Sequence, residues 1–97
     1  MSYNIPLDVE NDLKSFFSKF TFIEKVFVFG SRARQDNSPK SDIDLALFSS
    51  SMNRDEVANI KYELDELPIL YKMDIVHFEK SDKILQENIL KDGKQLF

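Results

Sequence analysis

The sequence predicts a small α/β (α+β) domain in which helices flank a mixed sheet of three or four strands. Its 97 residues form one domain over residues 1–97, because no repeat, low-complexity tract or linker divides them. Apolar runs of strand type alternate along the chain with segments whose apolar residues recur at helical spacing. A hydrophobic content of 42%, including nine Phe, suits a compact core.

The chain begins with an expected helix over residues 8–20, with Asp8 as its N-cap. One apolar stripe follows this helix: Leu13, Phe16, Phe17 and Phe20. Residues 21–29 are expected to form the first strand. The run 26–29 is apolar at every position, which is typical of a strand covered on both faces.

A glycine breaks that strand, and the second strand follows after a short helical turn and a loop. Gly30 ends the first strand, and Ser31 can cap a turn that runs through Arg34. Residues 36–40 are rich in turn formers and form the loop. The second strand is expected over residues 41–48, with apolar side chains alternating along it.

The second half of the chain repeats the alternation. A helix is expected over residues 54–67, ended by a following proline, and a third strand over residues 73–78. Ser81 can cap a last helix that Gly93 ends, and residues 94–97 can form a short fourth strand. The helical crossover between the second and third strands allows them to be parallel neighbours. The apolar residues near the C-terminus are assigned to the core in preference to an interface: Ile89, Leu90, Leu96 and Phe97.

Charge and composition exclude several classes of protein. The net charge of −4 disfavours general binding to nucleic acid, which needs a basic surface. The absence of cysteine excludes disulfides and thiolate metal sites. The N-terminus lacks a basic region followed by an apolar run, so neither a signal peptide nor a membrane span is expected. The cytoplasm is the simplest location.

Three aspartates are the candidate metal ligands. Asp42 and Asp44 are two residues apart on one expected strand and therefore face the same side. Asp is disfavoured in strands, so a pair needs a reason, and Mg²⁺ prefers such oxygen ligands. Asp74, on the third strand, can join them if the two strands pair. His77 has an odd offset from Asp74 and is expected to face away as a packing or partner-contact residue.

A candidate phosphate site precedes the aspartates. Gly30 allows close approach of the backbone to a ligand, and the helix start at Ser31 offers free N–H groups and a hydroxyl. Arg32, Arg34 and Lys40 place three cations nearby. A strand-to-helix turn of this kind is common, but its combination with Asp-x-Asp on the next strand is far more specific.

The chain resembles the DNA polymerase β-type nucleotidyltransferase superfamily in one pattern. Gly30-Ser31 is followed after ten residues by Asp42-x-Asp44, and Asp74 comes on a later strand. More narrowly, the chain is similar to the superfamily's minimal nucleotidyltransferase (MNT) proteins. The resemblance implies the polymerase β-like fold and Mg²⁺-dependent transfer of a nucleoside monophosphate from ATP or another NTP to a hydroxyl.

The same resemblance implies a role for each matching residue. Gly30 and Ser31, with Arg32 and Lys40 beside them, would bind the nucleotide. The three aspartates would be catalytic and would hold two Mg²⁺ ions, with Asp74 as the candidate base: Asp42, Asp44 and Asp74. One departure is visible at Gln35, where family members often carry glycine.

The resemblance also implies a partner. Many MNT proteins are antitoxins that adenylylate a tyrosine of a HEPN-domain toxin, and the small size of this chain leaves the acceptor site to a partner or a second copy. A homo- or hetero-oligomer is therefore expected. Two alternatives stay open: a non-catalytic antitoxin or binding module that neutralises its partner by contact, and, more weakly, a glycosyltransferase that uses Asp-x-Asp to hold a metal.

Overall fold

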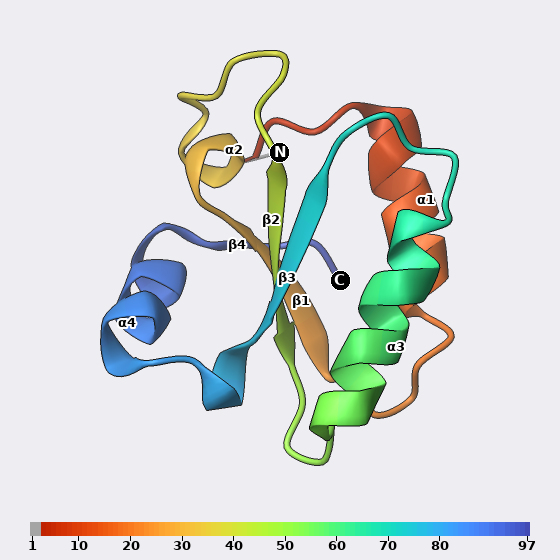
Figure 1. Ribbon diagram of the computed structural model, residues 1–97. Coiled ribbons are helices and arrows are strands. Elements are labelled where there is room, and N and C mark those ends of the chain that lie inside the picture. Colours follow the sequence, from red (N-terminus) through yellow and green to blue (C-terminus); the bar gives the residue numbers. More distant parts are fainter. Residues whose placement is uncertain (1–2) are drawn as a thin grey trace.

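A computed structural model describes residues 3–97 of the chain, with helices on both faces of a mixed four-stranded sheet (Figure 1). The elements are α1 (Leu7–Phe17), β1 (Lys25–Phe29), α2 (Ser31–Arg34), β2 (Ile43–Phe48), α3 (Arg54–Asp65), β3 (Met73–His77), the 3₁₀ helix η1 (Phe78–Lys80), α4 (Lys83–Asp92) and β4 (Lys94–Gln95). The predicted fold class, element order and short fourth strand are confirmed. Within residues 3–97, no helix has the length and apolar character needed to cross a membrane.

The sheet has the strand order β3-β2-β1-β4. β1 is antiparallel to both of its neighbours, whereas β2 and β3 are parallel, as the helical crossover predicts. In that parallel pair Asp44 is the register partner of Asp74. Two of the three predicted carboxylate positions are therefore neighbours across adjacent strands, about 4.8 Å apart along the hydrogen-bonding direction.

The two faces of the sheet are covered unequally. Side chains of β1, β2 and β3 on one face join α1 and α3 in the main core, which includes Leu13, Phe17, Val26, Val28, Ile43, Leu45, Leu47, Ile60 and Leu64. The opposite face has a smaller cluster in which Ile89 of α4 contacts Ala46 and Phe48 of β2. α4 thus covers only the end of this face where β2 finishes. The other end, beside α2, is free of helix α4 (Figure 1).

Several predicted ends and caps are wrong. Asp8 lies in the first turn of α1, because the N-cap is Pro6, whose ring fixes φ near the observed −54°. The expected strand 21–29 starts only at Lys25, after a turn, and the helix 54–67 ends at Asp65. Of the other predicted ends, several match the structure and the rest differ by one to three residues. Of the C-terminal apolar residues, Leu90 is exposed rather than packed.

The cap of the last helix is also not the predicted residue. Asp82 caps α4 through its side chain, which accepts from the N–H of Leu85 at 2.8 Å. Ser81 instead donates its hydroxyl to the carbonyl of His77, 2.9 Å away. Gly93 does end the helix, as predicted.

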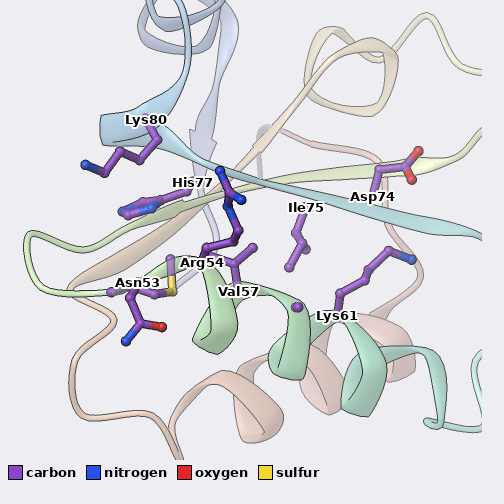
Figure 2. Close-up of a pocket in the computed structure, with 10 residues that line it drawn as sticks. Asn53, Arg54, Val57, Lys61, Asp74, Ile75, His77 and Lys80 are labelled. Atoms are coloured by element: carbon purple, nitrogen blue, oxygen red, sulfur yellow. The ribbon is translucent and has the colours of Figure 1, made fainter.

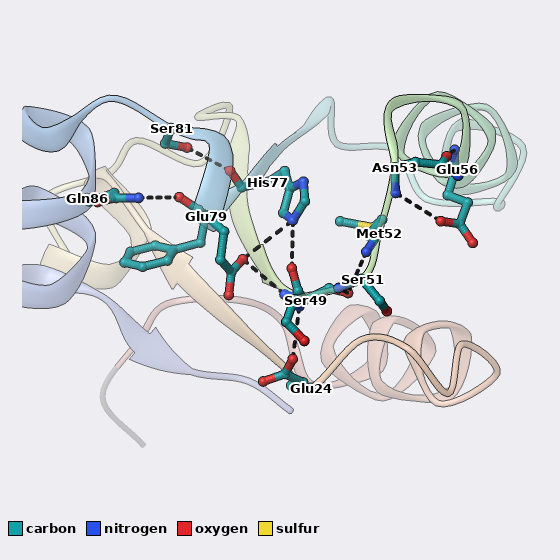
Figure 3. Close-up of polar contacts among 12 residues, drawn as sticks. Glu24, Ser49, Ser51, Met52, Asn53, Glu56, His77, Glu79, Ser81 and Gln86 are labelled. Atoms are coloured by element: carbon teal, nitrogen blue, oxygen red, sulfur yellow. Dashed lines mark hydrogen bonds and ion pairs between the residues drawn. The ribbon is translucent and has the colours of Figure 1, made fainter.

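A polar network holds the ends of β2 and β3 to the start of α3 (Figure 3). The Nε2 atom of His77 is 2.8 Å from the Ser49 carbonyl, and the Ser49 N–H donates to Glu79 at 3.0 Å. The next amide, that of Ser50, donates to Glu24 at 2.9 Å. These bonds satisfy backbone groups that the strands leave unpaired and fix the loop that leads into α3.

Gln35 terminates α2 in a left-handed conformation, with φ 64° and ψ 26°. Among residues 3–97 it is the only residue other than glycine with positive φ. The left-handed region costs a residue with a Cβ about 1–2 kcal/mol relative to glycine. The resemblance implies glycine at this position, and the structure shows that glutamine there is a source of backbone strain.

We expect Gln35→Gly to stabilise the protein. Relief of the left-handed strain exceeds the extra freedom that glycine gives the unfolded chain, for a net gain of up to about 1 kcal/mol. Urea unfolding measures the change. The matched control is Arg34→Gly, one residue earlier in helical conformation, which should instead lower stability by about 1 kcal/mol. Equal losses from both substitutions would contradict the assignment of strain to Gln35.

Candidate active site

The uncovered end of the α4 face carries the candidate carboxylates. Asp44 alternates with the α4 contacts Ala46 and Phe48 along β2, so its side chain lies on that face. Asp74 lies two residues before Val76, which packs against the same cluster. Asp42 precedes β2 and is exposed, whereas Asp44 and Asp74 are half-buried. The structure therefore places Asp44 and Asp74 on one face, with Asp42 just before β2 and near enough for its charge to act on Asp44.

Gly30 lies directly against Asp44. Its φ of 73° belongs to the region that favours glycine, and a Cβ added there would stand 2.6 Å from the Asp44 Oδ2 atom. Either fact alone excludes a larger residue without local movement. The candidate phosphate turn and the candidate metal ligand are thus in van der Waals contact, although fourteen positions separate them along the chain.

The pKa of Asp44 is raised above its ordinary value of 3.8, chiefly because burial penalises the carboxylate. The negative charges of Asp74 and then Asp42 raise it further, and the positive charge of Arg34 opposes them. Two nearby carboxylates and partial burial are the conditions under which a bound cation is most favourable, because it removes the repulsion.

The start of α2 provides polar groups next to these carboxylates. The N–H groups of Ala33 and Arg34 both donate to the Gly30 carbonyl at 3.1 Å. The helix offers no acceptor to the preceding amides of Ser31 and Arg32, as at any helix N-terminus. Arg34 is exposed and pairs with Asp36 at 3.1 Å, and it was missing from the nucleotide-binding residues predicted from the sequence. Its effect on Asp44 identifies it as the cation of this helix nearest the site.

Arg32, predicted to bind nucleotide, is buried and hydrogen-bonded within the protein. Its guanidinium donates to the carbonyls of Ser41 (2.9 and 3.1 Å), Asn4 (2.9 Å) and Pro39 (3.4 Å). Its planar face lies over the Tyr71 ring, 4.7 Å from the centroid. These contacts tie the loop before β2 to the N-terminal segment. They give Arg32 the role of positioning the loop and occupy four of its five N–H donors.

Lys40 lies in the exposed loop between α2 and β2, where its backbone N–H donates to Ser38. His77 points away from Asp74, as expected, and its side chain is only 8% exposed (Figure 2). It is a packing and hydrogen-bonding residue of the network between β2 and β3. Nothing in its position brings it to the carboxylates.

The donor set at this edge fits a hard divalent cation. Three carboxylates offer only oxygen ligands, and Mg²⁺ ordinarily takes one or two of them together with substrate phosphates. Within residues 3–97, no three acidic, His or Cys side chains are already gathered as a complete metal cluster. Asp44 and Asp74, which are register partners, are the pair that would hold the first ion.

Paired carboxylates on neighbouring strands, beside a Gly-Ser turn and a short helix, are the groups that a site for phosphate and a divalent metal needs. Comparison with known families gives the class of protein. The model for "Polymerase beta, Nucleotidyltransferase" matches residues 11–97, and the chain belongs to this nucleotidyltransferase family. A search of curated proteins gives no match.

Solved structures share the fold. One is a toxin–antitoxin complex with AMP-PNP, with a TM-score of 0.77, 20% identity, and coverage of 91% of this chain and 72% of that one. Another is a tri-AMPylated HEPN toxin of Shewanella oneidensis in complex with an MNT antitoxin (TM-score 0.70, 19% identity, coverage 91% and 68%). A third is an MntA–HpeT toxin–antitoxin with two Asp-to-Glu replacements two positions apart (TM-score 0.75, 19% identity, coverage 91% and 71%).

We expect Arg32→Ala to destabilise the fold by about 3 kcal/mol, because it removes a buried guanidinium and its hydrogen bonds to three part-buried carbonyls. Arg34→Ala on the same short helix should cost less than about 1 kcal/mol, since its ion pair is exposed. Chemical denaturation of both variants tests the assignment. A fully stable Arg32→Ala protein would show that the side chain does not organise the loop.

We expect Asp44→Asn to be more stable than the wild type near neutral pH. Because folding raises the pKa of Asp44, the folded chain binds the proton more tightly than the unfolded chain. Its ionised carboxylate therefore lowers stability as the pH rises through the raised value, and asparagine avoids this loss. The extra stability of the Asp44→Asn variant should disappear when the pH falls below the ordinary pKa of an aspartate carboxyl. Unfolding measured across that range, with the exposed Asp12→Asn on α1 as the control, checks the effect; a pH-independent difference would contradict it.

Proposed function

We propose that this protein transfers AMP from ATP to a hydroxyl, most specifically a tyrosine of a HEPN-domain toxin, and so acts as its antitoxin. The observation that carries the proposal is the contact between Gly30 and Asp44, with Asp74 as the register partner of Asp44. Similarity to complexes that contain AMP-PNP or an AMPylated HEPN toxin supports the nucleotide and the partner. A cytoplasmic location is part of the same proposal.

In this proposal the triphosphate lies along the start of α2. The amide and hydroxyl of Ser31 donate to phosphate oxygens, and Gly30 lets the backbone approach them. Arg34 adds positive charge near the same oxygens. Lys40, from the exposed loop, is the second cation that can reach a phosphate. Arg32 is left out, because it is committed to the loop carbonyls.

Asp42, Asp44 and Asp74 would hold Mg²⁺, most simply as two ions. The metal would stabilise charge on the entering and leaving oxygens of an in-line displacement. Asp74 accepts the proton of the acceptor hydroxyl. The acceptor oxygen then forms a bond to the α-phosphorus while the bond from that phosphorus to the bridging oxygen breaks, and pyrophosphate leaves. The protein aligns these groups and keeps its carboxylates on one face.

We expect label from α-labelled ATP to reach a purified HEPN protein encoded beside this chain when Mg²⁺ is present, and none from γ-labelled ATP. Asp44→Asn and Asp74→Asn should each reduce the rate at least about 100-fold, as losses of a metal ligand or base do. The measurement is label incorporated per unit time, with Asp12→Asn as the control.

The alternative, neutralisation by contact, makes the opposite prediction. In that case the wild type and the Asp44→Asn variant would neutralise the toxin equally and no label would be transferred. Calorimetry with ATP and Mg²⁺ adds a second criterion, because a purely contact-based antitoxin has no need to bind the nucleotide.

A further inference from the structure

A groove of about 840 Å³ lies beside the sheet on the face opposite the candidate carboxylates (Figure 2). It is bounded by α3 on one side and by β3 and η1 on the other. Its apolar lining comes from Met52, Val57, Ala58 and Ile75. Asp74 forms part of its rim, with its carboxylate directed to the other face of the sheet (Figure 2). The groove and the candidate active site therefore share one strand.

β3 is the outermost strand of the sheet, and its residues Ile75 and His77 line this groove. The N–H of Ile43 donates to the Lys72 carbonyl, so alternation directs the backbone of Asp74 and Val76 toward β2. The backbone of Ile75 is then directed outward, and no hydrogen bond from the described residues satisfies it there. The outward carbonyl of His77 accepts from Ser81 at 2.9 Å. One end of the edge is closed and its middle is open to another strand.

Positive charge gathers around the groove in a protein of net charge −4. Arg54, Lys61 and Lys80 all line it. Lys61 already pairs with Asp65 at 2.8 Å, whereas no carboxylate among residues 3–97 forms an ion pair with Arg54 or Lys80. An occupant with both carboxylates and apolar side chains would match the basic and the apolar residues that line the groove.

We propose that an extended, acidic segment of the acceptor protein binds in this groove as an added strand paired with β3. The inference rests on the proposed function and names how the protein substrate is held. Main-chain hydrogen bonds to Ile75 anchor the segment, and its acidic and apolar side chains enter the groove. An RNA backbone matches neither the free strand edge nor the apolar floor.

Alternation along such a strand explains how binding and chemistry are combined. Side chains of the added strand that point into the groove lie on the same face as Ile75. The side chain opposite Asp74 points to the other face, where the candidate carboxylates are, because neighbouring positions of paired strands share a face. A hydroxyl at that position is presented to Asp74, while the residues on either side are held in the groove.

A synthetic peptide tests the binding mode without any reaction. The probe is an octapeptide with blocked ends. Every second residue is Thr, and the residues between them, which face the groove, are alternately Asp and Val. Titration into labelled protein, followed by amide NMR, should shift the Ile75 and His77 signals. The same peptide with Lys for Asp, or with N-methyl groups on the edge that pairs with β3, should bind about tenfold more weakly or not at all.

Charge reversal on the protein makes the test reciprocal. Arg54→Glu with Lys80→Glu should weaken the Asp peptide about tenfold and bind the Lys peptide better than the wild type does. Lys83→Glu with Lys91→Glu, exposed on α4, is the matched control and should change neither affinity. Equal binding of both peptides by all three proteins would overturn the proposal.

Kinetics with the HEPN protein separate this inference from the proposed function. The groove variant should raise KM for the HEPN protein about tenfold while kcat and ATP affinity stay unchanged. If the wild type is active and the groove variant has the same KM for the HEPN protein, the groove proposal is wrong and the transferase proposal still stands. If the peptides bind with the expected charge preference but no label is transferred, the groove proposal stands and the transferase proposal is wrong. Loss of self-association as the sole effect of charge reversal would identify a second copy as the occupant and refute the proposal.

Discussion

The close approach of Gly30 to Asp44 is the constraint on which the site depends. It joins the end of β1 to the start of β2, which are already register neighbours through Phe29 and Asp44. A side chain at position 30 would separate the phosphate turn from the carboxylate. The antiparallel pairing of β1 with β2 and the parallel pairing of β2 with β3 then place the Gly-Ser turn, Asp44 and Asp74 at neighbouring positions of the sheet. The sheet thus sets the geometry, and the helices mainly stabilise the sheet.

Most of the local structure around this site is unfavourable on its own. Asp44 is a half-buried carboxylate beside two others, and Gln35 closes α2 in a left-handed conformation. The buried guanidinium of Arg32 offsets part of this cost by fixing the loop between them. The main core beneath the opposite face, with fully buried Leu13, Phe17, Leu45 and Leu64, provides the remaining stability. A cation bound by the aspartates would remove the electrostatic part of this cost, whereas the backbone strain at Gln35 would remain.

The sequence predicts the fold well, and with it the pairing of Asp44 with Asp74 across parallel strands, because both depend on periodicity and on residue spacing within strands. It predicts ends and caps less well. Asp8 and Ser81 are good caps by type, but Pro6 and Asp82 take those places, since a cap is decided by which neighbouring residue leaves the helical path first. Arg32 shows the deeper limit. Its distance from Gly30 along the chain suggested a phosphate ligand, yet its partners are carbonyls at positions 4, 39 and 41, which no local pattern reveals.

The two edges of the sheet differ in a way that limits how this protein can assemble. β4 contributes only two residues to its edge, whereas β3 contributes five. A two-residue edge is a poor template for another strand. Strand addition is therefore favoured at the β3 edge and disfavoured at the β4 edge. A sheet with one strong and one weak edge resists growth into filaments, because each added molecule would offer the next one only its poor template.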